Sequence, residues 1–307
     1  MSHDMHTLDL EFLGIHEAIP VFVFPTQGKI FLVECGPGST LPTLEGKLKA
    51  LGYSLDDISD VFITHIHLDH AGAAGSLARR GARIHVHPAG ARHLIDPEKL
   101  ITSAERIYGD QMQTLWGEFL PVAEKDLSIL EDGQVVKVGA IEVKSIHTPG
   151  HANHHIAYVI DGMCFSGDVG GSRMPGQHFI TLPMPPPDFH LETWYQTIEK
   201  LKALVLKKIV VTHYGAFEDV AWHLATLQEK LTEIDAWMQN VMPAAQSLED
   251  VHQKFMHWMQ AQYDRSGLPD EIRKQYEGAS PSWMSPAGLF RYWNKYRRDQ
   301  DDQSKEK

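Results

Sequence analysis

Short apolar runs separated by turn-forming residues dominate the chain as far as residue 215. Runs of about four to eight apolar or β-branched residues, bounded by Gly, Pro and polar clusters, are typical of β-strands. The pattern predicts strands at residues 8–13, 21–24, 30–33, 61–64, 83–86, 135–138, 141–146, 155–160, 163–165 and 209–212. The pair Asp161-Gly162 separates two of these strands and indicates a tight hairpin turn.

Helical spacing of apolar residues marks a second set of segments. Residues 41–51 place Leu44, Leu48 and Leu51 on one helix face, and helices are also predicted at residues 71–80, 97–119 and 190–206. After Gly215 the pattern predicts helices only, at residues 219–242, 248–263 and 285–298, and no further strand. We therefore predict an α/β part at residues 1–216, followed by a C-terminal helical region at residues 217–307.

The 19 histidines of the chain are most concentrated in the segment His65-Ile66-His67-Leu68-Asp69-His70, at the end of a predicted strand. Residues two apart on an extended segment point to the same side, so His65 and His67 can bind one metal ion. The turn into the next helix directs Asp69 and His70 toward a second ion. Imidazole and carboxylate ligands suit zinc, and also iron or manganese. Chance clustering is the competing interpretation, but four ligand-type residues within six positions count against it.

Three further ligand-type residues each follow an apolar strand in a glycine-containing turn. They are His151 in TPGH, Asp168 in SGD and His213 in THYG. Each signal is weak by itself, because isolated residues of this kind are common at strand ends. Taken in order with the histidine cluster, they form one pattern of ligand-type residues at strand ends.

Composition and charge narrow the choice of partners. The formal net charge of −12 is unfavourable for binding a phosphate backbone, so we expect no nucleic acid partner. Cys35 and Cys164 are predicted to be buried thiols and not a disulfide. The early apolar stretch at residues 19–24 is too short to span a membrane, and no signal peptide is evident, so we expect a cytoplasmic protein.

The motifs THIHLDH (64–70), TPGH (148–151), SGD (166–168) and THYG (212–215) together resemble those of the metallo-β-lactamase superfamily. The resemblance covers about residues 8–215 and implies an α/β fold, the αβ/βα four-layer sandwich, with a C-terminal helical extension. It implies one metal ion bound by His65, His67 and His151. It implies a second ion bound by Asp69, His70 and His213. Asp168 would bridge both ions.

The resemblance also implies a reaction. A flavodiiron oxidoreductase carries a glutamate at the position of His67, so this chain resembles the hydrolytic branch, and glyoxalase II and lactonases most. Two divalent ions, zinc in the first instance, would share a hydroxide that attacks the carbonyl of a small ester, thioester or lactone. Asp69 would relay a proton to the leaving group. Residues 169–173 depart from the corresponding glyoxalase II motif, which counts against glutathione as part of the substrate.

Two other functions remain open at this stage. One is a mononuclear iron persulfide dioxygenase of the same fold, which would hold one iron per chain. The other is a non-catalytic, metal-stabilised binding protein, against which the complete set of seven ligand-type residues argues. The apolar residues of the C-terminal helices indicate core packing or a homodimer face, and less readily a lid over the site.

Several residues near the motifs allow two interpretations. His154 and His155 either orient a ligand or pack in the core, whereas His85 and His87 are predicted to be structural. In three loop positions a substrate contact competes with an ordinary structural role: Arg173, His178 and Tyr214.

Overall fold

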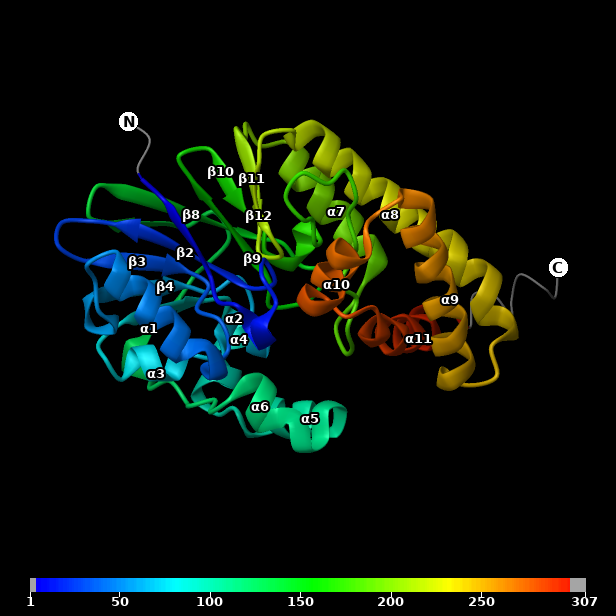
Figure 1. Ribbon diagram of the computed structural model, residues 1–307, viewed down its shortest axis with the longest axis horizontal. Coiled ribbons are helices and arrows are strands. Elements are labelled where there is room, and N and C mark those ends of the chain that lie inside the picture. The colour runs from blue at the N-terminus through cyan, green and yellow to red at the C-terminus, as the bar shows by residue number, and fades with distance from the viewer. Residues whose placement is uncertain (1–3, 299–307) are drawn as a thin grey trace.

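Two six-stranded sheets form the centre of this computed structural model, which describes residues 4–298 (Figure 1). The first sheet contains, in spatial order, β1 (His6–Asp9), β2 (Pro20–Pro25), β3 (Ile30–Val33), β4 (Ile58–Phe62), β5 (Arg83–Val86) and β6 (Leu127–Ile129). The second contains, in spatial order, β12 (Gly215–Phe217), β11 (Lys208–Val211), β10 (Met163–Phe165), β9 (Ile156–Ile160), β8 (Ile141–His147) and β7 (Val135–Val138). Each half of the chain therefore supplies one sheet.

Helices cover the outer faces of the sheets. The first half contributes α1 (Leu41–Ala50), α2 (Leu68–Ala71), α3 (Ala74–Ala78), α4 (Pro88–Ile95), α5 (Glu98–Tyr108) and α6 (Met112–Trp116). The second half contributes α7 (Leu191–Lys202), α8 (Val220–Val241), α9 (Leu248–Ser266), α10 (Asp270–Ala279) and α11 (Ser285–Tyr296). In Figure 1, α1 to α6 lie on one side of the paired sheets, α7 and α8 lie on the other, and α9 to α11 extend from α8. This arrangement is the predicted αβ/βα sandwich.

Side-chain alternation along the strands explains why the sheets stack. In β2, Phe22 and Phe24 face the other sheet, whereas Val21 and Val23 face the helices. Phe165 of β10 meets Phe22 and Phe24 edge to face, with ring centroids 5.2 and 5.6 Å apart. These aromatic contacts join the two sheets. A strand that is buried on both faces needs apolar residues at every position, and β2 and β3 have them.

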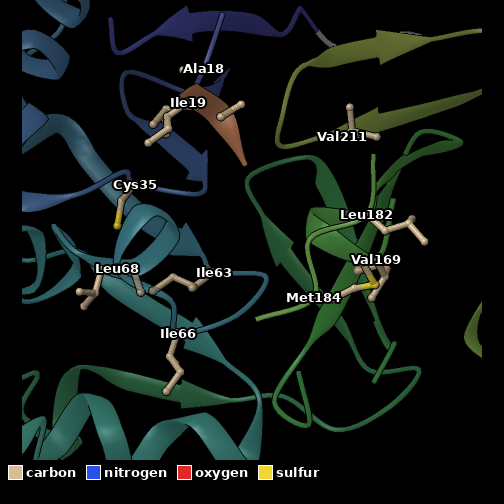
Figure 2. Packing of buried hydrophobic residues seen from close by; sticks show 14 of the residues in the cluster. Ala18, Ile19, Cys35, Ile63, Ile66, Leu68, Val169, Leu182, Met184 and Val211 are labelled. Atoms are coloured by element: carbon tan, nitrogen blue, oxygen red, sulfur yellow. The ribbon is translucent and has the colours of Figure 1, made fainter. Parts of the chain in front are cut away.

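A second hydrophobic cluster lies between the sheets and the helices, and it continues into the C-terminal region. Figure 2 shows part of it, with Cys35, Ile63 and Ile66 from the first half facing Val169 and Met184 from the second. Both cysteines are buried and free, as predicted. The cluster also includes residues of α8 to α11, so these helices share one core with the sheets. The proposed boundary between residues 216 and 217 stays a prediction, and residues 299–307 lie outside the described part.

The predicted and observed elements differ at several points. The strands at 30–33, 83–86, 135–138 and 163–165 are confirmed, but β1 ends at Asp9 and the segment at 8–13 turns into a short 3-10 helix. The predicted helix at 97–119 breaks at Gly109 into α5 and α6, and the one at 71–80 is divided between α2 and α3. The sequence pattern did not reveal α4, β6 and α10. The expectation of no strand after Gly215 was also wrong, because β12 pairs with β11 at the sheet edge.

Among the described residues, no helix combines the length and the apolar composition needed to cross a bilayer.

The aromatic contact between the sheets provides a test of this packing. We expect Phe165→Ala to lower the free energy of unfolding by about 3–5 kcal/mol, because it opens a cavity between two sheets. Urea unfolding measures the change. Val205→Ala is the matched control, since Val205 is 96% exposed and its truncation removes little buried area. Equal losses in the two variants would contradict the proposed role of Phe165.

Candidate metal centre

Seven side chains from four separate segments converge at one edge of the paired sheets. The segments follow the ends of β4, β8, β10 and β11, where the sequence had predicted metal ligands. Three groups each place their ligand atoms within 4.8 Å of one another: His65, His67 and His151; His65, His70 and Asp168; and Asp69, His70 and His213. The structure thus brings together every side chain that the sequence analysis assigned to a metal site.

The group of His65, His67 and His151, called the first group below, consists of three imidazoles whose nitrogens point at a common position. His67 Nδ1 lies 2.8 Å from His65 Nε2 and 3.0 Å from His151 Nε2. His65 and His67 flank Ile66 on an extended segment, so their rings fall on one side of the chain, while His151 arrives from the turn after β8. Three nitrogens at this spacing match the ligand set of a tetrahedral ion that keeps one position open.

The group of Asp69, His70 and His213, called the second group below, combines one carboxylate with two imidazoles. Asp69 Oδ2 lies 3.3 Å from His70 Nε2 and 3.4 Å from His213 Nε2. Asp69 and His70 lie within α2, the short helix that begins directly after His67. The change from extended to helical backbone brings these two side chains to His213, as expected for a second cluster of ligand-type residues beside the first.

Asp168 lies between the two groups. Its Oδ2 is 4.0 Å from His65 Nε2 and 3.5 Å from His151 Nε2. Its Oδ1 is 3.3 Å from His70 Nε2 and 3.5 Å from His213 Nε2. Each oxygen therefore faces a different group, which is the geometry that a bridging carboxylate needs.

Acceptors behind the rings fix which nitrogen faces the site. His151 Nδ1 donates to the carbonyl of Pro183 at 2.8 Å, and His213 Nδ1 donates to the carbonyl of Ala18 at 2.8 Å. A carbonyl can only accept, so Nδ1 must carry the proton in both rings. Their Nε2 atoms then present lone pairs to the site, as metal ligation requires.

Glu34 sets the orientation of two more ligands. This fully buried carboxylate accepts from His70 Nδ1 at 3.0 Å and from the hydroxyls of Thr64 and Thr212 at 2.5 and 3.1 Å. Because the Thr64 proton goes to Glu34, Thr64 Oγ1 accepts from His65 Nδ1 at 3.0 Å. The sequence analysis missed Glu34. The feature that could have identified it is its position, since it is a charged residue directly after the apolar strand β3.

The charges around the site favour a bound cation. Burial opposes ionisation of Asp69 and Asp168, but the neighbouring imidazoles, His70 foremost, outweigh it and hold the pKa of both carboxylates below the ordinary value. Burial lowers the pKa of His67 to about 3, with the adjacent His151 lowering it further. The same two causes, burial and nearby imidazoles, hold the pKa of His65 well below its ordinary range. Both rings are therefore neutral near pH 7 and can donate lone pairs.

His70 Nε2 and Asp168 Oδ1 are buried and lie 3.3 Å apart, but neither has a hydrogen-bond partner among the described residues. The Nδ1 proton of His70 is donated to Glu34, so Nε2 presents a lone pair to the carboxylate oxygen. Buried polar atoms are almost always satisfied in folded proteins, and each one left without a partner costs about 1–3 kcal/mol. A cation between the two groups would satisfy both atoms. The donor set, five imidazoles and two carboxylates, suits zinc and other first-row divalent ions.

The turn that carries Asp168 depends on Gly167. Its φ of +51° is unfavourable for other residues, and a Cβ there would lie 2.5 Å from His155 Nε2. His155 Nε2 accepts from the backbone N–H of Asp168, and His155 Nδ1 lies 2.8 Å from Thr148 Oγ1. His155 therefore orients the Asp168 turn.

His154 contacts the backbone between His65 and His67. Its Nδ1 accepts from the N–H of Ile66 at 3.5 Å, and its Nε2 lies 3.9 Å from Asp188. Of the two roles left open for His154 and His155, the structure favours support of the site. His85 is structural, as predicted: it is paired with Asp60 at 2.7 Å and stacked on Phe62.

The loop residues for which the sequence left a substrate contact open have other surroundings in the structure. Arg173 is buried and pairs with both oxygens of Asp219 at 2.7 and 2.8 Å, so it is not available to a substrate carboxylate. His178 packs edge to face on Trp222, with centroids 4.6 Å apart. Tyr214 is half-buried, and burial together with the charges of Asp9 and Glu17 raises its pKa. His87 accepts from the N–H of Ala89 at the start of α4.

Comparison with known proteins agrees with this geometry. The family model described as the metallo-beta-lactamase superfamily matches residues 18–213, a span that contains all seven side chains. The chain belongs to the metallo-beta-lactamase superfamily. Members of this superfamily bind divalent metal ions, and most are metal-dependent hydrolases.

Individual members of the superfamily are similar to about half, two thirds or nearly all of the chain. The metallo-beta-lactamase fold-containing protein ST1585 of Sulfurisphaera tokodaii is 26% identical over 66% of this chain and 78% of its own length. A hydroxyacylglutathione hydrolase of Aeromonas hydrophila is 31% identical over 48% of this chain, and the match spans 45% of that enzyme. The metallo-beta-lactamase family protein TTHA1429 of Thermus thermophilus shares the fold over 95% of this chain and 93% of its own, with a TM-score of 0.69 and 17% identity.

Glu34 provides a test of the site that does not depend on knowing the substrate. We expect Glu34→Gln to weaken metal binding by about 10–100-fold, because His70 and Thr64 lose the carboxylate that orients them. Titration against a competing chelator measures the affinity. Asp60→Asn is the matched control, since it removes a carboxylate from His85, a histidine outside the site. Unchanged affinity in Glu34→Gln would show that the orientation of His70 does not depend on this charge.

Proposed function

We propose that the protein is a dinuclear metal-dependent hydrolase that cleaves a small ester, thioester or lactone. The observation that carries the proposal is the arrangement of Asp168, whose two oxygens face two separate groups of ligand-type side chains. One group would suffice for a single ion. A second complete group at the far side of a shared carboxylate supports a site for two.

In this proposal each residue has a defined task. His65, His67 and His151 hold one divalent ion, Asp69, His70 and His213 hold the other, and Asp168 bridges them. Zinc fits the donor set, with iron or manganese as alternatives. Bound divalent ions would supply an activated water near neutral pH and polarise the substrate carbonyl. Glu34, Thr64 and the carbonyls of Pro183 and Ala18 keep the imidazole lone pairs aimed inward.

Asp69 is suited to move a proton during the reaction. Its side chain is 19% exposed, compared with 5% for Asp168, so it borders the side that solvent can reach. The carboxylate is ionised, because the neighbouring imidazoles outweigh burial and lower its pKa, and we assign it the task of carrying a proton from the attacking water to the leaving group.

The substrate is proposed as a small molecule in the cytoplasm. The net charge of −12 disfavours nucleic acid. The similarity to hydroxyacylglutathione hydrolases supports cleavage of an acyl compound; one from Aeromonas hydrophila matches 48% of this chain at 31% identity, and one from Aliivibrio fischeri matches 75% at 25% identity. Arg173, the basic residue closest after the SGD motif, is held by Asp219. These observations favour an acyl substrate other than a glutathione conjugate.

Metal analysis together with a substrate panel tests the proposal. We expect two divalent ions per chain by elemental analysis, and turnover of at least one compound among aryl esters, thioesters and lactones. The double variant His67→Ala/Asp168→Ala should lose both the ions and the turnover, whereas the exposed His178→Ala should keep both. One iron per chain without hydrolysis would instead support a persulfide dioxygenase. Full metal content with no turnover would support a binding protein.

The role of Asp69 is tested separately by Asp69→Asn. The amide keeps the shape of the side chain but accepts a proton poorly, so we expect kcat to fall by about 100–10,000-fold. The measurement is steady-state kinetics at saturating metal, with metal content assayed in the same samples. A kcat within about threefold of the wild type would remove Asp69 from proton transfer.

A further inference from the structure

The segment of residues 172–188, which follows the Asp168 turn, touches two of the candidate ligands through its backbone. At one end, the N–H of Arg173 donates to the carbonyl of His213, and the N–H of Tyr214 donates back to the carbonyl of Arg173 at 3.1 Å. Near the other end, the carbonyl of Pro183 accepts from His151 Nδ1. The position of this segment therefore determines where two imidazoles lie, one in each group.

The C-terminal helices hold the same segment. The hydroxyl of Tyr276 on α10 accepts from the N–H of Met174 at 3.1 Å and donates to the carbonyl of Phe179 at 2.7 Å. Tyr276 is fully buried, so water cannot replace either bond. Ser285, the first residue of α11, accepts from the N–H of Met184 at 3.3 Å. One turn of helix later, Gly288 packs so closely that a Cβ would lie 2.0 Å from the carbonyl oxygen of Met184.

A second anchor fixes the start of the segment from the opposite direction. Besides its two bonds to Asp219, the guanidinium of Arg173 lies between the rings of Phe217 and Trp222, 4.0 and 4.4 Å from their centroids. With Arg173 held on this side and Tyr276 on the other, residues 172–179 have little freedom to shift. The C-terminal contacts therefore extend to the metal centre through one short stretch of backbone.

We propose that Tyr276 and Ser285 are positioning residues for the metal centre, and that the C-terminal helical region sets metal affinity through the 172–188 segment. This inference rests on the proposed function. The physical reason is that an imidazole ligand is oriented by the acceptor behind it, and loss of such a partner typically weakens metal binding by about 10–100-fold. Here the acceptor of His151 is a backbone carbonyl, so whatever holds that backbone holds the ligand.

Removal of one hydroxyl tests the proposal. Tyr276→Phe leaves the N–H of Met174 and the carbonyl of Phe179 buried without partners, so the segment should move to satisfy them. We expect zinc affinity to fall by about tenfold. We also expect the visible absorption spectrum of the cobalt-substituted protein to change, because that spectrum reports ligand geometry. Competition with a chelator and cobalt titration, both well below the unfolding midpoint, provide the two measurements.

Tyr263→Phe is the matched control. Tyr263 is also buried in the C-terminal region and packs against Phe179, but its hydroxyl donates to Glu277 on α10. We expect it to lower stability toward urea while leaving zinc affinity and the cobalt spectrum as in the wild type. Wild-type affinity and spectrum in Tyr276→Phe would overturn the inference. Equal weakening in both variants would overturn it too, because the loss would then follow general stability.

A second pair of variants tests the same proposal if Tyr276→Phe does not fold. Ser285→Ala removes the partner of Met184, whereas Ser282→Ala removes a hydroxyl that donates to Glu277 of α10, within the helical region. We expect weaker zinc binding in Ser285→Ala alone, and equal affinities would overturn the inference. Titration of the wild type separates the two proposals. A wild type that binds no stoichiometric metal refutes both, whereas full binding in the wild type and in every variant refutes only the positioning role.

Discussion

Nitrogen lone pairs that converge from three sides repel one another unless a cation lies between them. In this protein the facing nitrogens of His65, His67 and His151 lie within hydrogen-bonding distance, yet two of the three rings have their proton committed to an acceptor behind them. His67 Nδ1 can supply at most one proton to the two lone pairs that face it, so hydrogen bonds among the three rings satisfy the set only in part. The need to hold these lone pairs together, with a carboxylate beside them, is the constraint that the surrounding structure must meet.

The fold meets this constraint by holding four of the imidazoles from the side opposite the site: His65, His70, His151 and His213. Glu34 links β3, β4 and the end of β11 through His70, Thr64 and Thr212, so one buried carboxylate joins both sheets at the site. The aromatic contacts between the sheets hold the same two halves together farther from the site. Packing and polar contacts therefore act on the same pair of sheets, and distortion of either would displace ligands from both groups.

Local patterns in the sequence, together with the family resemblance that they carry, were sufficient to predict which side chains converge and much of the fold. Alternating and continuous apolar runs placed most strands, and the spacing of His65, His67, Asp69 and His70 follows from strand and helix geometry alone. Glu34 and Tyr276 could not be predicted in this way, because their partners lie 30 to 178 and 97 to 102 residues away along the chain. The missed helix α10 had the same cause: its polar composition hides a face that is defined only by tertiary contact.

Several of the candidate ligands are oriented by groups behind them, so the side of the site that faces solvent is not needed to hold them in place. On that side Tyr108 of α5 lies near enough to Asp69 for burial and the carboxylate charge to raise its pKa. The Tyr108 hydroxyl also lies 3.4 Å from the sulfur of Met284, just before α11. The C-terminal region therefore borders the centre both at the backbone of the 172–188 segment and beside Asp69. In the proposed dinuclear site, a change in these helices would alter substrate choice on the solvent side and metal affinity on the other, and would leave the metal-ligand side chains in place.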